Sequence, residues 1–158
     1  MKKIRVGILI AALWIPLMLG AISAALTMDE MKAYAEIIKP PLSPPTIVFP
    51  IAWTILYIMM GLASYFILVA EDEEKGRFTA LGFYMAQLVM NFMWSIVFFN
   101  WKFYLFAFFW LIVMWILVIV TTVKFSRFSR CAAWLMIPYI VWLVFAAYLN
   151  MGVYLLNR

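Results

Sequence analysis

The side chains in this sequence that could recognise another molecule are neutral amides and large aromatic rings. Gln87 and Asn91 are four residues apart, and Trp94 and Phe98 continue the same face of a helix. A few polar groups among apolar rings are typical of a pocket that binds a mostly apolar small molecule and orients it with few hydrogen bonds. The residue types therefore indicate binding more strongly than acid–base or nucleophilic chemistry.

The same combination of rings and polar groups recurs in two other apolar stretches. One of them has a face at steps of four residues with two flanking side chains, and it comprises Pro138, Trp142, Ala146 and Asn150 with Tyr139 and Leu149. In the other, Trp53 and Tyr57 share a face just after a proline-rich run. Because several tryptophans offer surfaces for ring stacking, a ligand of such a pocket is expected to be flat, apolar and aromatic.

These residues also have a purely structural interpretation, which the sequence leaves open. On that interpretation Gln87, Asn91 and Asn150 only form hydrogen bonds between helices, worth about 1 kcal/mol each. Tryptophan and tyrosine also mark the two interfaces of a membrane. This interfacial role fits Trp101 and Trp134 best, since each lies next to a short loop.

Composition excludes several kinds of chemistry. The chain has no His and a single Cys, which removes imidazole metal sites, His-ligated haem, disulfides within the chain and triads with a His base. Cys131 is expected to be a small buried apolar residue. No metal site is predicted.

The candidate residues lie in five stretches without any charged side chain. Each is at least as long as the roughly 20 apolar residues that cross a bilayer as a helix, and they cover residues 6–28, 40–70, 78–101, 103–123 and 131–157. In all, 69% of the 158 residues are hydrophobic and 12% are charged. The alternating pattern of a barrel strand is absent, so helices must satisfy the backbone in lipid. The sequence predicts an all-α integral membrane protein, a bundle of five transmembrane helices.

The predicted membrane spans form one domain of the whole chain. They lie at about 6–28, 46–70, 78–100, 103–123 and 131–155. Within the fourth span, Trp110 and Trp115 lie on different faces, and we expect lipid contact or core packing for them. Because no span contains Asp, Glu, Lys or Arg, transport driven by protons or ions is disfavoured.

Residues 29–45 form a long connector between the first two spans. Met31, Tyr34, Ile37 and Ile38 fall at helical spacing, which predicts a short helix at the membrane surface. The prolines that follow cannot continue a helix. We expect the connector to fold over the open end of the bundle as a lid.

Lysine and arginine are distributed unequally between the two sides. One side has eight, which are Lys2, Lys3, Arg5, Lys75, Arg77, Lys124, Arg127 and Arg130. The other side has four, which are Lys32, Lys39, Lys102 and Arg158. This bias predicts that the amino end is cytoplasmic. It also makes the net charge of +5 a signal of topology, so no nucleic-acid partner is expected.

Three long motifs resemble those of the translocator protein family, the tryptophan-rich sensory proteins also called peripheral-type benzodiazepine receptors. The motifs are Lys39-Pro40-x-x-x-Pro44-Pro45-x-x-x-Phe49-Pro50-x-x-Trp53-x-x-Leu56-Tyr57-x-x-Met60-Gly61-x-Ala63, Gln87-Leu88-x-x-Asn91-x-x-Trp94-x-x-x-Phe98-Phe99, and Pro138-Tyr139-x-x-Trp142-x-x-Phe145-Ala146-x-x-Leu149-Asn150. The resemblance implies a five-helix bundle, often a dimer, in a bacterial cell membrane. Its pocket would open toward the connector and bind porphyrins, benzodiazepine-like drugs and, in animal members, cholesterol.

Two positions depart from the pattern of that family. Leu42 and Ala33 stand where its members usually have tryptophan. The lid of this chain is therefore expected to hold an aromatic ligand less firmly, and Leu42→Trp is expected to slow the dissociation of a porphyrin.

The leading hypothesis is a membrane receptor or sensor that binds porphyrin-type tetrapyrroles. Its partners would be the lipid bilayer, a porphyrin or haem as ligand and a second copy of the chain, with no cofactor required. The predicted ligand-binding residues are Pro45, Phe49, Trp53, Tyr57, Gln87, Asn91, Trp94, Phe98, Pro138, Tyr139, Trp142, Ala146, Leu149 and Asn150. One alternative is an enzyme that degrades porphyrin with light and oxygen, in which the resemblance gives Trp53 and Trp142 the catalytic role. Another is a transporter of porphyrins or other small molecules.

Overall fold

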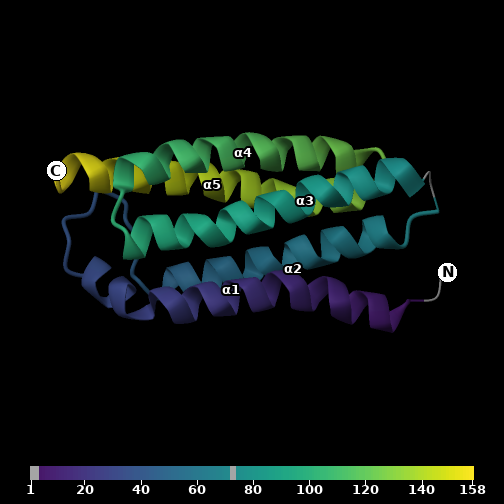
Figure 1. Cartoon of the computed structure of the whole chain (residues 1–158), viewed down its shortest axis with the longest axis horizontal. Coiled ribbons are helices and arrows are strands. Elements are labelled where there is room, and N and C mark those ends of the chain that lie inside the picture. Colours follow the sequence, from purple (N-terminus) through teal and green to yellow (C-terminus); the bar gives the residue numbers. More distant parts are fainter. Residues whose placement is uncertain (1–3, 72–73) are drawn as a thin grey trace.

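Five long helices form the described part of the chain, residues 4–71 and 74–158 of a computed structural model (Figure 1). They are α1 (Val6–Tyr34), α2 (Val48–Leu68), α3 (Glu74–Ser95), α4 (Tyr104–Ser126) and α5 (Arg130–Leu156), and α3 continues into a π-helical segment, η1 (Ile96–Asn100). All five are long and apolar enough to cross a membrane. The prediction of an all-helical, multi-pass membrane protein is thus confirmed. Lys2 and Lys3, on which the predicted orientation partly depends, lie outside the described residues.

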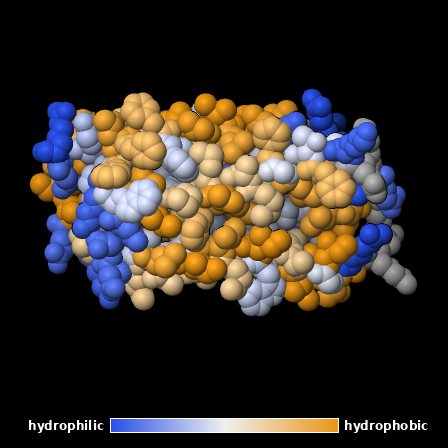
Figure 2. Space-filling model, viewed as in Figure 1, coloured by the Kyte–Doolittle hydropathy of each residue, from blue (hydrophilic) through white to orange (hydrophobic). Residues whose placement is uncertain are grey.

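The surface of the bundle is apolar around its middle and polar at its two ends (Figure 2). Large aliphatic side chains are exposed there on several helices, among them Ile10, Val113 and Val141. A helix that is apolar on all sides is expected in lipid, where nothing favours a polar outer face. This belt is therefore the surface that contacts the bilayer.

Close packing and indole hydrogen bonds hold neighbouring helices together. A Cβ atom added at Gly61 would lie 2.9 Å from the carbonyl oxygen of Ala12, so α1 and α2 approach closely there. Trp110 Nε1 donates to the carbonyl oxygen of Met90 at 2.9 Å, and Trp115 Nε1 donates to that of Ile140 at 3.2 Å. These two tryptophans join α4 to α3 and to α5, which agrees with core packing.

The first helix is longer than the predicted span. Residues 29–34, which the sequence assigned to the connector, continue α1 as far as Tyr34. They contain no proline or glycine, so nothing interrupts the helix between the span and the expected surface helix. The non-helical connector runs over residues 35–47.

The connector is attached to the carboxyl-terminal half of α5. The Ile38 backbone N–H donates to Asn157 Oδ1 at 3.2 Å, and Asn157 Nδ2 donates to the Ile38 carbonyl oxygen at 2.7 Å. Tyr148 Oη donates to the carbonyl oxygen of Pro41 at 2.6 Å. The connector therefore crosses one end of the bundle and lies against α5 (Figure 1).

Three side chains near loops test expectations from the sequence. Trp101 is 52% exposed and Trp134 is 73% exposed, as residues of an interfacial belt should be. Cys131 is also exposed, so the expectation of a buried cysteine is wrong. It lies in the first turn of α5, which begins at Arg130.

Candidate functional site

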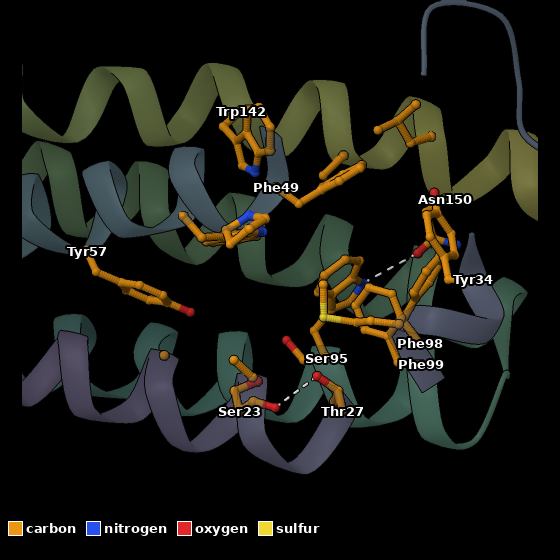
Figure 3. A pocket seen from close by; sticks show the side chains of 18 residues that line it. Ser23, Thr27, Tyr34, Phe49, Tyr57, Ser95, Phe98, Phe99, Trp142 and Asn150 are labelled. Atoms are coloured by element: carbon orange, nitrogen blue, oxygen red, sulfur yellow. Dashed lines mark hydrogen bonds between the residues drawn. The ribbon is translucent and has the colours of Figure 1, made fainter. Parts of the chain in front are cut away.

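A cavity opens among four of the helices at the connector end of the bundle (Figure 3). About 810 Å³ of empty space lies within it, part of which is open to the outside. Its lining consists of Gly20, Ser23, Ala24, Thr27, Met31, Tyr34, Phe49, Pro50, Trp53, Tyr57, Trp94, Ser95, Phe98, Phe99, Trp142, Ala146, Leu149 and Asn150. No Asp, Glu, Lys, Arg or Cys is among these described lining residues.

Trp53 of α2 is the centre of the aromatic wall. Its ring stacks on that of Tyr57, with centroids 5.7 Å apart and planes at 29°. It meets Trp142 of α5 edge-on at 6.2 Å and 82°, and Trp94 of α3 at 6.5 Å. These are favourable geometries for aromatic pairs, and they hold the rings of three helices around one space.

The connector end of the cavity is closed by rings from η1 and α1. Phe98 stacks on Trp94 at 5.2 Å and 22°, and it meets Phe99 edge-on at 4.9 Å. The π-helical turn, in which the Trp101 N–H bonds to the Ile96 carbonyl oxygen, lets both consecutive phenylalanines face the cavity. Tyr34 packs edge-on against Phe99 at 5.6 Å.

The two buried asparagines position rings. Asn91 Oδ1 accepts a hydrogen bond from Tyr57 Oη at 2.7 Å, and Asn91 Nδ2 donates to Tyr139 Oη at 2.8 Å. Asn150 Oδ1 accepts from Trp94 Nε1 at 3.4 Å, and Asn150 Nδ2 donates to the Tyr104 carbonyl oxygen at 2.7 Å. Each amide thus joins helices, as the structural interpretation of the sequence requires.

The indole N–H of Trp142 is the unsatisfied polar group of the wall. Nε1 is buried and has no hydrogen-bond partner among the residues that the structure describes. Figure 3 shows the ring extending from α5 with its nitrogen toward the cavity. A buried donor without an acceptor costs about 1–3 kcal/mol, so a ligand that offers an acceptor at this point would recover free energy.

The structure brings together most of the side chains predicted from the sequence. Nine of them line the cavity, which are Phe49, Trp53, Tyr57, Trp94, Phe98, Trp142, Ala146, Leu149 and Asn150. Asn91, Gln87 and Tyr139 are buried outside the lining, and Gln87 Nε2 has only a 3.7 Å contact with Met60 Sδ. Pro45 and Pro138 are exposed and do not belong to the lining.

The sequence did not predict the wall that α1 contributes. Gly20, Ser23 and Ala24 line the cavity from within the first predicted span, and Met31 and Tyr34 line it from residues that the sequence assigned to the connector. Thr27 completes this wall, and its Oγ1 donates to the Ser23 carbonyl oxygen at 2.9 Å (Figure 3). The small residues were the available signal, because they leave room for a neighbour. Pro50, Ser95 and Phe99 were also missed.

The proline-rich part of the connector contributes nothing to the lining. All lining residues lie outside 35–47, and Leu42 is 84% exposed. At the connector end the lining comes from Met31 and Tyr34, in the last turns of α1.

Comparison with known proteins relates this chain to one family. A model of the TspO/MBR family matches residues 12–156. The chain is 35% identical to the tryptophan-rich protein TspO of Chlorobaculum tepidum, over 95% of this chain and 97% of that protein. It is 40% identical to the tryptophan-rich sensory protein of Cereibacter sphaeroides, over 85% of this chain and 81% of that protein. It is 34% identical to the human translocator protein, over 77% of this chain and 73% of that protein.

Proposed function

This chain belongs to the TspO/MBR family, and on that premise we propose that it is a membrane receptor or sensor for flat, apolar tetrapyrroles such as porphyrins. The ligand lies in the ring-lined cavity and stacks on its indoles. The resemblance of the three sequence motifs to tryptophan-rich sensory proteins supports this ligand class.

The observation that carries the proposal is the Trp142 indole. Among the described residues its N–H is a buried donor without a partner, and it borders a cavity with seven further aromatic residues in its lining. A conjugated ligand with hydrogen-bond acceptors matches both features, since stacking uses the rings and one acceptor uses the N–H.

Titration with protoporphyrin, followed by quenching of tryptophan fluorescence, tests the proposal. Trp142→Phe should weaken binding about five-fold, as expected for the loss of one hydrogen bond of ~1 kcal/mol. Trp134→Phe is the matched control, because it also removes one indole but from a residue that is 73% exposed. Equal losses in the two variants would contradict the assignment of the cavity as the binding site.

Light-driven degradation of porphyrin is a second candidate function. The oxidisable rings of Trp53 and Trp142 both line the cavity and are 6.2 Å apart. Because the described lining residues include no Asp, Glu, Lys, Arg or Cys, light and oxygen would have to drive the reaction. Loss of porphyrin in light but not in darkness, abolished by Trp53→Phe and Trp142→Phe together, would favour this function. Equal loss without protein would exclude it.

We also propose that the chain forms a homodimer and that its amino end is cytoplasmic. The orientation can be tested at Cys131, the chain's single cysteine, which is exposed next to the basic loop before α5. A thiol reagent that cannot cross membranes should label Cys131 in inside-out vesicles and leave it unlabelled in right-side-out vesicles. The reverse result would invert the topology.

A further inference from the structure

A second, smaller cavity lies beside the first at the connector end of the bundle. It encloses about 310 Å³ of empty space, part of it open to the outside, and it is lined by Glu30, Ala33, Tyr34, Ile37, Phe98, Phe99, Lys102 and Tyr104. Tyr34, Phe98 and Phe99 line both cavities. The two spaces are therefore separated by a wall that is one ring thick.

The two cavities differ in charge. The larger one is lined by neutral residues, whereas the smaller one is lined by Glu30 from α1 and Lys102 from the turn before α4. Lys102 Nζ lies 2.9 Å from Glu30 Oε2. The hydrogen bond that Lys102 donates to Glu30 raises the pKa of Lys102 above its ordinary value, so the ammonium is charged at neutral pH.

The Glu30–Lys102 ion pair can exchange partners at little cost. The side chain of Lys102 is 53% exposed and that of Glu30 is 38% exposed. Ion pairs at this degree of exposure contribute about 0–1 kcal/mol, because both charges remain solvated when they separate. A carboxylate that enters the smaller cavity could therefore replace Glu30 as the partner of Lys102.

We propose that the smaller cavity seats the acidic arm of a ligand whose rings occupy the larger one, with Lys102 as the cation that binds the carboxylate. This inference rests on the function proposed above and adds a preference for amphipathic ligands with a free carboxylate. The arm passes the Tyr34 edge of the shared wall, and its charge stays at the polar end of the bundle. That placement avoids the cost of burying a carboxylate at membrane depth.

The experiment compares protoporphyrin IX, which has free carboxylates, with its dimethyl ester. Fluorescence quenching gives the affinity of both probes for the full chain and for Lys102→Gln. The acid should bind the unmodified chain more tightly than the ester, and Lys102→Gln should weaken acid binding about five-fold while ester binding stays unchanged. Unchanged ester binding also shows that the variant is folded.

Two further variants sharpen the test. Lys32→Gln removes the same charge at the same end of the bundle. Lys32 lies in α1, pairs with Asp29 at 3.3 Å and lies outside the lining of both cavities. This variant should leave the preference for the acid intact. Glu30→Gln removes the competitor for Lys102 and should strengthen acid binding about two- to five-fold.

The outcomes separate the two proposals. If neither probe binds the unmodified chain, the proposed function fails. Another outcome is that both probes bind while Lys102→Gln and Lys32→Gln weaken binding of the acid equally, or while neither variant changes it. In that case the proposal that Lys102 binds the carboxylate is wrong, and the receptor proposal stands. Added salt should also reduce the preference for the acid, because an exposed charge pair is screened, and a preference that is insensitive to salt would argue against Lys102.

Discussion

The side chains inside this bundle are similarly apolar at its two ends, but they are packed differently. Away from the connector, methionine and aliphatic side chains pack closely, among them Ile67, Val118 and Met136, each 0% exposed. At the connector end, rings meet edge-on around the larger cavity.

Side-chain shape explains this difference. Flexible methionine and branched aliphatic chains adapt to irregular gaps, whereas rigid rings held at steep angles leave space between them. The cavity therefore lies where these rings face the small residues Gly20, Ser23 and Ala24 of α1. Hydrogen bonds that Tyr57 and Trp94 donate to Asn91 and Asn150 keep their rings in place.

Truncation of one leucine that is fully packed and of one that borders the cavity should show the largest difference. Leu143 is 0% exposed, whereas Leu149, also in α5, is 4% exposed and borders the cavity. Leu143→Ala should lower the free energy of unfolding by about 2 kcal/mol, near the lower end of the usual range, because lost packing contacts dominate in a membrane protein. Leu149→Ala should lower the free energy of unfolding by clearly less, since one side of Leu149 already faces empty space.

Unfolding in detergent micelles, with increasing denaturing detergent, measures both leucine variants under the same conditions. Equal losses in the free energy of unfolding would contradict the distinction between the close-packed region and the region around the cavity.

Substitution of a glycine tests the close approach of α1 and α2. A Cβ at Gly61 would lie 2.9 Å from two backbone atoms, the Ala12 carbonyl oxygen and Leu13 Cα, which cannot move unless the helices separate. Gly61→Ala should therefore lower the free energy of unfolding by about 1–3 kcal/mol. Gly82 has nothing within 4 Å of its Cβ position, so Gly82→Ala should be neutral or stabilising. A neutral Gly61→Ala would show that this contact is loose.

The smallest effect is expected at Leu42. The family pattern predicts that a tryptophan here slows the dissociation of a porphyrin, but Leu42 is 84% exposed and residues 35–47 lie outside the cavity lining. From its position in the structure we expect Leu42→Trp to change the dissociation rate less than about two-fold. Stopped-flow release of protoporphyrin decides between the two expectations. Slower release would mean that the connector moves over the cavity when a ligand is bound.

The sequence alone determined the five helices and the faces that carry rings. Long stretches without charge allow only helices in lipid, and the spacing of Trp53 and Tyr57, or of Trp142 and Asn150, places them on one face of one helix. Nine predicted site residues consequently lie in the cavity lining. Periodicity within a helix is a local property, and the printed sequence contains it in full.

Only the tertiary structure decided which faces meet and what each polar group does there. It made α1 a wall of the cavity, extended that helix to Tyr34, and turned Phe98 and Phe99 inward through the π-helical segment. It also gave Asn91 two tyrosine partners and left the Trp142 N–H without one. These outcomes depend on contacts between residues that are distant in the chain, and the pattern along a single helix carries no information about its neighbours.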